Sequence, residues 1–285
     1  MQSVVVTGVS TGIGYATTEV LLKHDFRVFG SVRKQGDAQR LVDAFGSAFV
    51  PLIFDVTDKS AIERGAAQVR DALNGRTLSG VVNNAGVAVA GPLLEMPVED
   101  FQRQLDINVL GPFLVNQAFG PLLGTDPALH GEPGRIINIS SVAGKKAMPF
   151  LGPYATSKFG LEGYSDALRR EMLLFGIDVI VIGPGPVQTP IWDKADELDV
   201  DTYADTPYFP ILERFKRLSI ESGHQGYPAS RIGELIYTAL TIKNPKTRYA
   251  AVKGRFLEKA VMRAASPRAL DKLIARTLGI SRLAK

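Results

Sequence analysis

The chain has 285 residues and contains no cysteine, which excludes disulfides, thiolate metal sites and a cysteine nucleophile. Its 45% hydrophobic and 22% charged residues are typical of a soluble globular chain with a substantial core. The net charge of +4 is uneven, because residues 253–285 carry nine Lys or Arg against two acidic residues, which gives +7 there and −3 in the remainder.

The sequence indicates neither a membrane span nor a metal site. No apolar run reaches the roughly 18–20 residues that a spanning helix needs. The N-terminus begins with a strand-like segment rather than a signal peptide, so we expect a cytoplasmic protein. The histidines, His24, His130 and His224, lack metal-ligand spacing. The basic residues 253–285 suit a solvated helix face; weak peripheral contact with an anionic membrane is the alternative, and no nucleic-acid partner is expected.

Short apolar segments alternate with helix-length amphipathic stretches along the chain. The predicted strands are residues 3–7, 27–32, 48–54, 80–82, 135–139, 179–182 and 247–252, and the predicted helices include 58–73, 98–123 and 153–175. Near-continuous Val, Ile and Phe runs are typical of strands buried on both faces of a parallel sheet. The alternation predicts one α/β domain over residues 1–285, with a doubly wound parallel sheet of about seven strands. Residues 190–226 are a predicted helical insertion and 253–285 a basic helical extension.

Polar residues or turn-forming residues follow the ends of six of these strands. They are Gly8, Arg33, Asp55, Asn83, Ser141 and Pro184. Because the carboxyl ends of parallel strands meet at one edge of a sheet, where ligands bind, these residues are predicted to converge on one cleft.

A glycine-rich turn follows the first strand directly. Its spacing, Gly8-x-x-x-Gly12-x-Gly14, allows a tight turn and a close approach to a pyrophosphate, which the N-terminus of the next helix would bind. This position in an α/β sheet predicts a Rossmann-type site for a dinucleotide, NAD(P). The predicted contacts are Gly8, Ser10, Thr11, Gly12, Ile13 and Gly14.

The choice of cofactor depends on the end of the second strand. An acidic residue there would bind the ribose 2′-hydroxyl of NAD, but the sequence has Arg33 and Lys34. Because a guanidinium can bind a 2′-phosphate with two hydrogen bonds, NADP(H) is the predicted cofactor and NAD(H) the second choice. The alternative is that Arg33 is a solvated loop arginine.

Two more segments are predicted to border the cofactor. Asp55, followed by Val56, could accept a hydrogen bond from the adenine amino group, with a surface turn as the alternative. Residues 83–86, Asn-Asn-Ala-Gly, end the fourth strand, where two amides and small residues could support the centre of the sheet beside the cofactor, with a plain turn as the alternative. The predicted cofactor contacts there are Asn83, Ala85 and Gly86.

The sequence contains two Tyr-x-x-x-Lys pairs, Tyr154/Lys158 and Tyr249/Lys253. Gly152-Pro153 is a natural helix entry, so the first pair would lie on neighbouring helical turns, about 5–6 Å apart at Cβ. The second pair lies in or beside a strand, where four residues span roughly 13 Å, and is interpreted as packing and surface residues. An ammonium beside a phenol favours the phenolate, so Lys158 is expected to lower the pKa of Tyr154 from about 10 to about 7–9. Lys158 could also hydrogen-bond the cofactor ribose.

Ser141 ends the fifth strand and could donate a hydrogen bond to a substrate oxygen, which would stabilise a developing alkoxide. Ser140 would point to the opposite face if the strand continues, so only one of the two can serve. A simple strand-to-loop turn is the alternative, and spacing alone leaves it open.

In this order, the motifs resemble the short-chain dehydrogenase/reductase family over a segment that ends at Thr189. The matching positions are 7–14, Asp55, 83–86, Asn108, Ser141, Tyr154, Lys158, Pro184, Gly185 and Thr189. The resemblance implies an oxidoreductase of CH–OH groups in which Tyr154 donates the proton in reduction and Lys158 assists it. It also implies that Ser141 orients the carbonyl and that Asn108 holds a water in a proton relay. Thr189 would contact the nicotinamide carboxamide, with Pro184, Gly185 and Val187 beside it.

Residues 28–34, 159–163 and 184–192 resemble the 17β-hydroxysteroid and retinol dehydrogenase-like branch of the family. A lipophilic secondary alcohol or ketone (steroid-, retinoid- or long-chain-like) is therefore the predicted substrate. Ser141, Tyr154, Met148 and Trp192 are the predicted substrate contacts, and cover for the sheet edge is an equal alternative for the two apolar residues. The family commonly assembles through helices at 98–123 and 153–175, so we expect a homodimer or homotetramer.

Three other functions stay open at this point. One is a ketoreductase of smaller or acyl-carrier-bound substrates. The second is a non-catalytic NADP(H)-sensing or interaction protein, against which the intact Ser141, Tyr154 and Lys158 count. The third is a nucleotide-sugar epimerase or dehydratase, which the glycine spacing and the short C-terminal part oppose.

Overall fold

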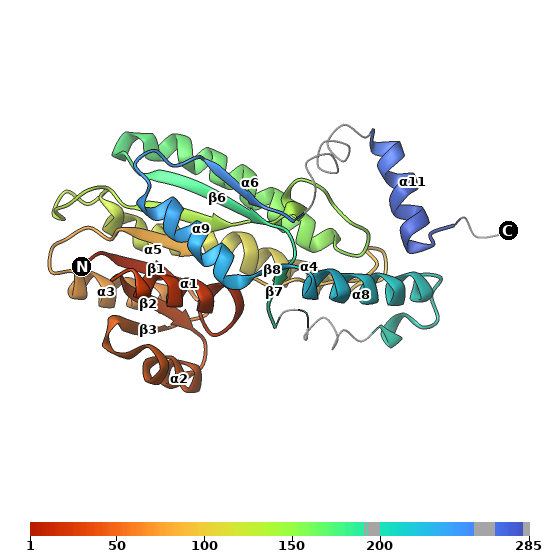
Figure 1. Ribbon diagram of the computed structural model, residues 1–285, viewed down its shortest axis with the longest axis horizontal. Helices are drawn as coiled ribbons and strands as arrows, with labels where there is room; N and C mark the ends of the chain where they lie inside the picture. The colour runs from red at the N-terminus through yellow and green to blue at the C-terminus, as the bar shows by residue number, and fades with distance from the viewer. Residues whose placement is uncertain (191, 193–199, 254–265, 282–285) are drawn as a thin grey trace.

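Seven parallel strands form the central sheet, in the order β3-β2-β1-β4-β5-β6-β9 (Figure 1). They are β1 (Ser3–Val6), β2 (Arg27–Val32), β3 (Phe49–Ile53), β4 (Gly80–Asn83), β5 (Arg135–Ile139), β6 (Asp178–Pro184) and β9 (Arg248–Ala251). All seven predicted strands are confirmed, with ends that differ from the prediction by at most two residues. The computed structural model describes residues 1–190, 192, 200–253 and 266–281.

Helices cover both faces of the sheet, because its strands are apolar on both. One layer contains α1 (Gly12–Lys23), α2 (Gln35–Phe45) and α9 (Ala229–Thr241); the other contains α3 (Lys59–Leu73), α5 (Gly111–Phe119) and α6 (Gly152–Glu171). Successive side chains of a strand point to opposite faces. In β1, Val4 and Val6 therefore pack into the first layer and Val5 into the second, and all three are fully buried. This is the predicted doubly wound arrangement.

The predicted helix at 98–123 is interrupted in the structure. α4 (Val98–Leu105) leads into a π-helical turn (Asp106–Leu110), and α5 and a 3₁₀ turn (Gly120–Leu123) follow. In the π-helical turn the Gly111 N–H donates to the carbonyl of Asp106. Pro112 has no N–H and cannot bond the Asn108 carbonyl as an α-helix requires. The proline therefore explains why the helix departs from α geometry at Asn108.

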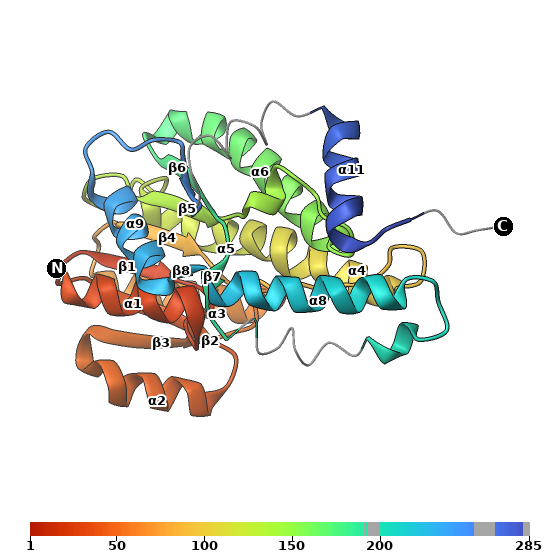
Figure 2. The same ribbon diagram turned by 45° about the vertical axis from the view of Figure 1, so that its right-hand side comes forward.

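Two helices of the insertion and the C-terminal extension lie at the end of the molecule opposite the N-terminus (Figures 1 and 2). They are α8 (Phe209–His224) and α11 (Pro267–Leu278). Their apolar residues meet those of segment 145–151 in one cluster, whose buried members are Phe150, Tyr203, Leu212, Phe215 and Leu278. Residues 191, 193–199, 254–265 and 282–285 of the insertion and the extension lie outside the described residues.

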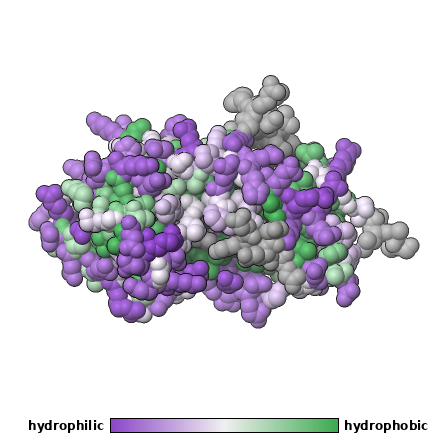
Figure 3. All heavy atoms as spheres, turned by 60° about the horizontal axis from the view of Figure 1, so that its bottom comes forward, coloured by the Kyte–Doolittle hydropathy of each residue, from purple (hydrophilic) through white to green (hydrophobic). Residues whose placement is uncertain are grey.

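A short parallel pair of strands, β7 (Val187–Gln188) and β8 (Tyr227–Pro228), joins the residues just before the insertion to those that follow it. Seen from the side of α2 and α8, polar residues cover most of the surface, with apolar patches between them (Figure 3). None of the described helices is long and apolar enough to span a membrane.

Candidate active site

The glycine-rich turn connects β1 to α1 as predicted. Gly8 and Gly12 have φ angles of +69° and +62°, which side-chain-bearing residues rarely adopt. A Cβ on Gly14 would collide with the Gly8 carbonyl and the Asn84 side chain. The turn therefore requires glycine at these positions, and it leaves the backbone bare where a ligand would approach.

The N-terminus of α1 suits the pyrophosphate of a dinucleotide. Thr11 is the N-cap, and among the described residues no side chain caps the helix there. The first amide N–H groups, of Gly12, Ile13 and Gly14, thus keep their donor capacity at the positive end of the helix dipole. Ser10 lies in the same turn, where its carbonyl accepts a hydrogen bond from Arg40 Nη2 (2.8 Å).

The end of β4 locks this turn in place through Asn84 rather than Asn83. Asn84 Nδ2 donates to the carbonyls of Thr7 (2.8 Å) and Gly8 (3.1 Å), and the N–H groups of Asn84 and Ala85 donate to Thr7 Oγ1 (3.0 Å each). Asn84 belongs to the predicted segment 83–86, but Asn83 rather than Asn84 is the predicted cofactor contact. Adjacent side chains of a strand point to opposite faces, so only one of the two asparagine side chains can face the glycine-rich turn.

The side chain of Asn83 does not face the glycine-rich turn. Its Nδ2 donates to the side-chain oxygens of Asn116 (2.9 Å) and Asn138 (2.8 Å), all three being buried. The side chain of Asn83 thus joins β4, β5 and α5 in an amide network that supports the centre of the sheet, and its predicted contact with the cofactor stays a prediction. Gly86 lies against Asn108, with which the next residue, Val87, is hydrogen-bonded.

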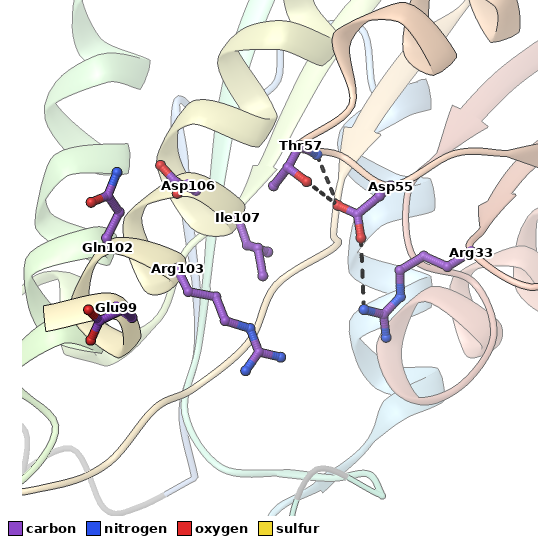
Figure 4. Close-up of a pocket in the computed structure, with 8 residues that line it drawn as sticks. All are labelled: Arg33, Asp55, Thr57, Glu99, Gln102, Arg103, Asp106 and Ile107. Carbon is purple, nitrogen blue, oxygen red and sulfur yellow. Dashed lines mark hydrogen bonds and ion pairs between the residues drawn. The ribbon is translucent and has the colours of Figure 1, made fainter. Parts of the chain in front are cut away.

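The ends of β2 and β3 form a pocket of about 380 Å³ (Figure 4). Arg33 Nη1 lies 3.8 Å from Asp55 Oδ2, and Asp55 Oδ1 accepts hydrogen bonds from the Thr57 N–H (3.0 Å) and hydroxyl (2.8 Å). The side chain of Arg33 is 62% exposed, so its guanidinium is accessible to a ligand phosphate. Val56 is buried and packs against Gly111 at the start of α5, so only its backbone can border the pocket.

Tyr154 and Lys158 lie one turn apart on α6, as predicted. The Lys158 ammonium is buried, donates to the Ile139 carbonyl (2.8 Å) and lies 5.6 Å from the centre of the Tyr154 ring. Burial lowers the pKa of Lys158 to about 8, because it disfavours the charged form.

The pKa of Tyr154 is shifted in the direction opposite to the one predicted. Burial raises its pKa above the usual value, and a hydrogen bond from the Ser141 hydroxyl offsets part of that rise. The prediction that Lys158 lowers the pKa of Tyr154 is therefore wrong for the protein residues alone. The Lys158 ammonium is hydrogen-bonded to the Ile139 carbonyl, and the loss of solvation has the larger effect on the phenol.

Ser141, rather than Ser140, is placed beside the phenol. Ser141 has an extended backbone, begins a 3₁₀ turn (Val142–Gly144) and accepts a hydrogen bond from the Ala143 N–H (3.1 Å). Ser140 is buried and lies on the side of Glu162. The alternation of the strand thus selects between the two serines, as predicted.

Asn108, in the π-helical turn, connects the loop after β4 to the catalytic helix. Its Nδ2 donates to the Val87 carbonyl (2.9 Å) and to Ser157 Oγ (3.1 Å), and its Oδ1 accepts from the Val87 N–H (2.9 Å). Ser157 Oγ in turn donates to the Tyr154 carbonyl (2.7 Å). The side chain of Asn108 therefore positions α6; its predicted role in a water relay stays a prediction.

Segment 184–192 reaches the glycine-rich turn. Thr189 lies against Gly12, since a Cβ on this glycine would be 3.3 Å from the threonine side chain. The Gly185 N–H donates to the carbonyl of Ala251 (2.8 Å), and this hydrogen bond fixes the backbone that follows Pro184 at the end of β6. Thr189 is thereby held close to the turn that is predicted to bind the cofactor.

The two predicted apolar substrate contacts have different surroundings. Trp192 packs on Gly223 of α8, and its indole N–H donates to the Val187 carbonyl (2.7 Å), so it anchors α8 beside β7. Met148 is exposed on the segment before α6. The Tyr249/Lys253 pair is set aside as expected, because Lys253 donates to the carbonyls of Gln225 and Gly226.

Comparison with known proteins identifies the family to which this fold and site belong. The family described as short chain dehydrogenase matches residues 2–199. The chain is 37% identical over 278 residues to an NADPH-dependent 3-dehydrocapnine reductase of Ornithobacterium rhinotracheale, covering 98% of each protein. It is 32% identical to retinol dehydrogenase 5 of Homo sapiens, covering 87% of this chain and 79% of that protein. A solved short-chain dehydrogenase from Streptomyces avermitilis superposes with a TM-score of 0.75 at 25% identity, over 99% of this chain and 98% of that one. The chain belongs to the short-chain dehydrogenase/reductase family of oxidoreductases.

Proposed function

We propose that this chain is an NADP(H)-dependent oxidoreductase that moves a hydride between nicotinamide and a lipophilic secondary alcohol or ketone, with Tyr154 as its acid and base. One observation carries the proposal: Ser141, Tyr154 and Lys158 are assembled at the sheet edge that also holds the glycine-rich turn. A proton donor and a dinucleotide turn at one edge are what carbonyl reduction requires.

Two observations support NADP(H) as the cofactor. Arg33, at the end of β2, is exposed toward the pocket where the adenosine half would lie, and no acidic residue takes its place. The relative from Ornithobacterium rhinotracheale is named for its dependence on NADPH. An Arg33→Asp variant should lower affinity for NADPH and leave affinity for NADH little changed; equal losses for both would contradict the assignment.

The residues at the site suit proton transfer to a carbonyl oxygen. NADPH, when bound, supplies the hydride. The Tyr154 hydroxyl, whose pKa lies above its usual value, is protonated at neutral pH and donates its proton to the substrate oxygen. The Ser141 hydroxyl, beside the phenol, donates a hydrogen bond to the same oxygen and stabilises its developing charge. The Lys158 ammonium lowers the cost of the phenolate that remains.

A lipophilic substrate is supported by the apolar character of the end where α8 and α11 lie. Phe150, of the segment before α6, packs with Tyr208 and Phe215 of the insertion. Retinol dehydrogenase 5 and the 3-dehydrocapnine reductase are both relatives over most of this chain. A keto group on a long apolar substrate would reach Tyr154 from this end.

A substrate panel tests the proposal. Retinal, a 3-ketosteroid, long-chain ketones and small polar ketones would be compared by the loss of NADPH absorbance. We expect kcat/KM at least about tenfold higher for the lipophilic ketones, the discrimination given by a few buried methylenes. Turnover of the small polar ketones alone would contradict the substrate class and favour the ketoreductase alternative. Tight NADPH binding without turnover of any ketone or alcohol would favour a sensor.

A further inference from the structure

The pocket beside Arg33 has a second arginine on its opposite wall. Arg33 and Asp55 follow β2 and β3, whereas Arg103 projects from α4 on the other side, next to Ile107 (Figure 4). Arg103 lies in the middle of a predicted helix and belongs to no motif, so its sequence alone does not mark it as a site residue. The packing of α4 places it at the wall of this pocket.

The guanidinium of Arg103 is available to a ligand. In the part of the chain that the structure describes, no hydrogen bond or ion pair involves this side chain, whereas Arg33 lies within 3.8 Å of Asp55. Two carboxylates of the same helix segment, Glu99 and Asp106, line the pocket one turn before and one turn after Arg103. Neither forms an ion pair with it at 4.0 Å or less among the described residues.

We propose that Arg103 stacks its guanidinium plane on the adenine ring of the cofactor. It would cover the face of the ring on the side of the pocket opposite Arg33. A guanidinium is planar and weakly hydrated, and it stacks on aromatic faces, including nucleobases. Ile107, on the same wall, adds apolar surface for the ring. Asp55, beside Arg33, would accept the adenine amino N–H. This inference rests on the proposed function, which places the adenosine half of NADP(H) in this pocket.

The charges around Arg103 favour adenine over a phosphate as its ligand. With Glu99 and Asp106 beside it, the wall formed by α4 has a net charge of −1. That wall disfavours a phosphate dianion but accepts a neutral base. At the opposite wall, the charge of Arg33 balances that of Asp55, so this neutral wall with an exposed guanidinium is the better place for the 2′-phosphate. Arg103 thus binds the part of the cofactor that NADPH and NADH share.

The test uses two variants and three nucleotides. Arg103→Leu removes the plane and the charge, and Arg103→Lys keeps the charge but removes the plane; Arg268→Leu, on the exposed side of α11, is the control. Dissociation constants for NADPH, NADH and reduced nicotinamide mononucleotide, which lacks adenine, would be measured by fluorescence. Thermal unfolding would confirm that each variant is folded.

We expect Arg103→Leu to raise the dissociation constants of NADPH and NADH by about fivefold, the size of one exposed cation–π contact. Arg103→Lys should raise both by a smaller factor, because an ammonium keeps the cation–π attraction but lacks the stacking plane. The ratio of the two constants, the mononucleotide and the control variant should stay unchanged. A loss confined to NADPH and restored by lysine would overturn the inference in favour of a phosphate contact, and so would the absence of any loss. A wild-type protein that binds neither dinucleotide would overturn the proposed function, and this inference with it.

Discussion

At the scale of the residue, the proton chemistry depends on how burial changes two neighbouring groups. Burial lowers the pKa of Lys158 to about 8 and raises that of Tyr154 above its usual value. The lysine therefore loses its charge at a lower pH than the tyrosine loses its proton. In reduction, the ammonium stabilises the phenolate that forms, so titration of Lys158 should limit the rate first.

We predict that kcat/KM for ketone reduction at saturating NADPH is constant below about pH 7 and falls as the pH rises through about 8, the pKa of Lys158. The sign follows because the charged lysine, present at low pH, is the active form. A pH series from 6 to 10.5 measures this. A decline centred above pH 10 would instead assign the limit to the Tyr154 hydroxyl itself.

The glycine-rich turn gives a second prediction at this scale. Gly14→Ala should destabilise the fold by about 1–3 kcal/mol, because the added methyl collides with the Gly8 carbonyl and the Asn84 amide. Gly36→Ala is the matched control: this glycine lies in α2, has open space around it, and should give up to about 1 kcal/mol of stabilisation. Urea unfolding measures both, and equal effects would contradict the close approach.

At the scale of the element, an ionic cluster connects α6 to the strand at the edge of the sheet. Glu162, buried one turn after Lys158, pairs with Lys145 (2.9 Å) and Arg248 (2.6 Å), and Arg248 also pairs with Asp166 (3.2 Å). Burial raises the pKa of Glu162, but contacts with Lys145 and Arg248 outweigh it and hold that pKa below 4.5. The stabilisation is therefore present above about pH 4.5 and is lost as the pH falls through the lowered pKa.

Glu162→Gln should destabilise the protein by about 2 kcal/mol, somewhat less than for a fully buried pair, because Arg248 and Lys145 lose their shared carboxylate. Asp166→Asn serves as the control, since this more exposed carboxylate contacts the same arginine and should cost about 1 kcal/mol or less. Chemical denaturation at pH 7 separates the two. Equal losses would indicate that burial of Glu162 makes no difference.

At the scale of the whole molecule, exposed apolar residues gather where α5, α6 and the π-helical turn meet. Leu110, Phe113 and Phe159 are exposed, and Gly160 lies against Val109, which places α6 beside the π-helical turn. The predicted homo-oligomer would cover such a face, because exposed apolar patches commonly mark interfaces.

We therefore expect the protein to be a dimer or tetramer in light scattering. Phe113→Glu combined with Phe159→Glu should shift it toward the monomer, because each charge would be desolvated in the interface. Leu174→Glu, at an exposed leucine in the 3₁₀ turn (Met172–Phe175) after α6, is the control. A wild-type monomer, or a double variant with unchanged mass, would contradict the prediction.

Much of the fold and of the candidate site could be predicted from the sequence, for definite physical reasons. Parallel strands buried on both faces leave continuous Val and Ile runs, so the sheet was evident. The pair Tyr154/Lys158 was distinguished from Tyr249/Lys253 by helix spacing alone. The sequence could not show the π-helical turn at Asn108. It depends on which carbonyls the N–H groups around Pro112 bond to, those of an α-helix or those of a π-helix.

Other features depend on contacts between distant segments. Asn84 rather than Asn83 meets the glycine-rich turn, because the alternation of side chains along β4 decides which of the two amides faces it. The pKa of Tyr154 depends on burial that only the packed site provides. Arg103 faces the pocket because of where α4 packs, and nothing in its neighbouring residues indicates this.

In the proposed function, Tyr154 carries the proton in an NADPH-dependent reduction. The most direct measurement is NADPH consumption with a lipophilic ketone by the wild-type protein, Tyr154→Phe and Tyr249→Phe. We expect Tyr154→Phe to lower kcat by about 10²- to 10⁴-fold with NADPH affinity retained, since the variant lacks only the proton donor. Tyr249→Phe, from the pair set aside, should stay near wild-type. Turnover that survives in Tyr154→Phe would contradict the account.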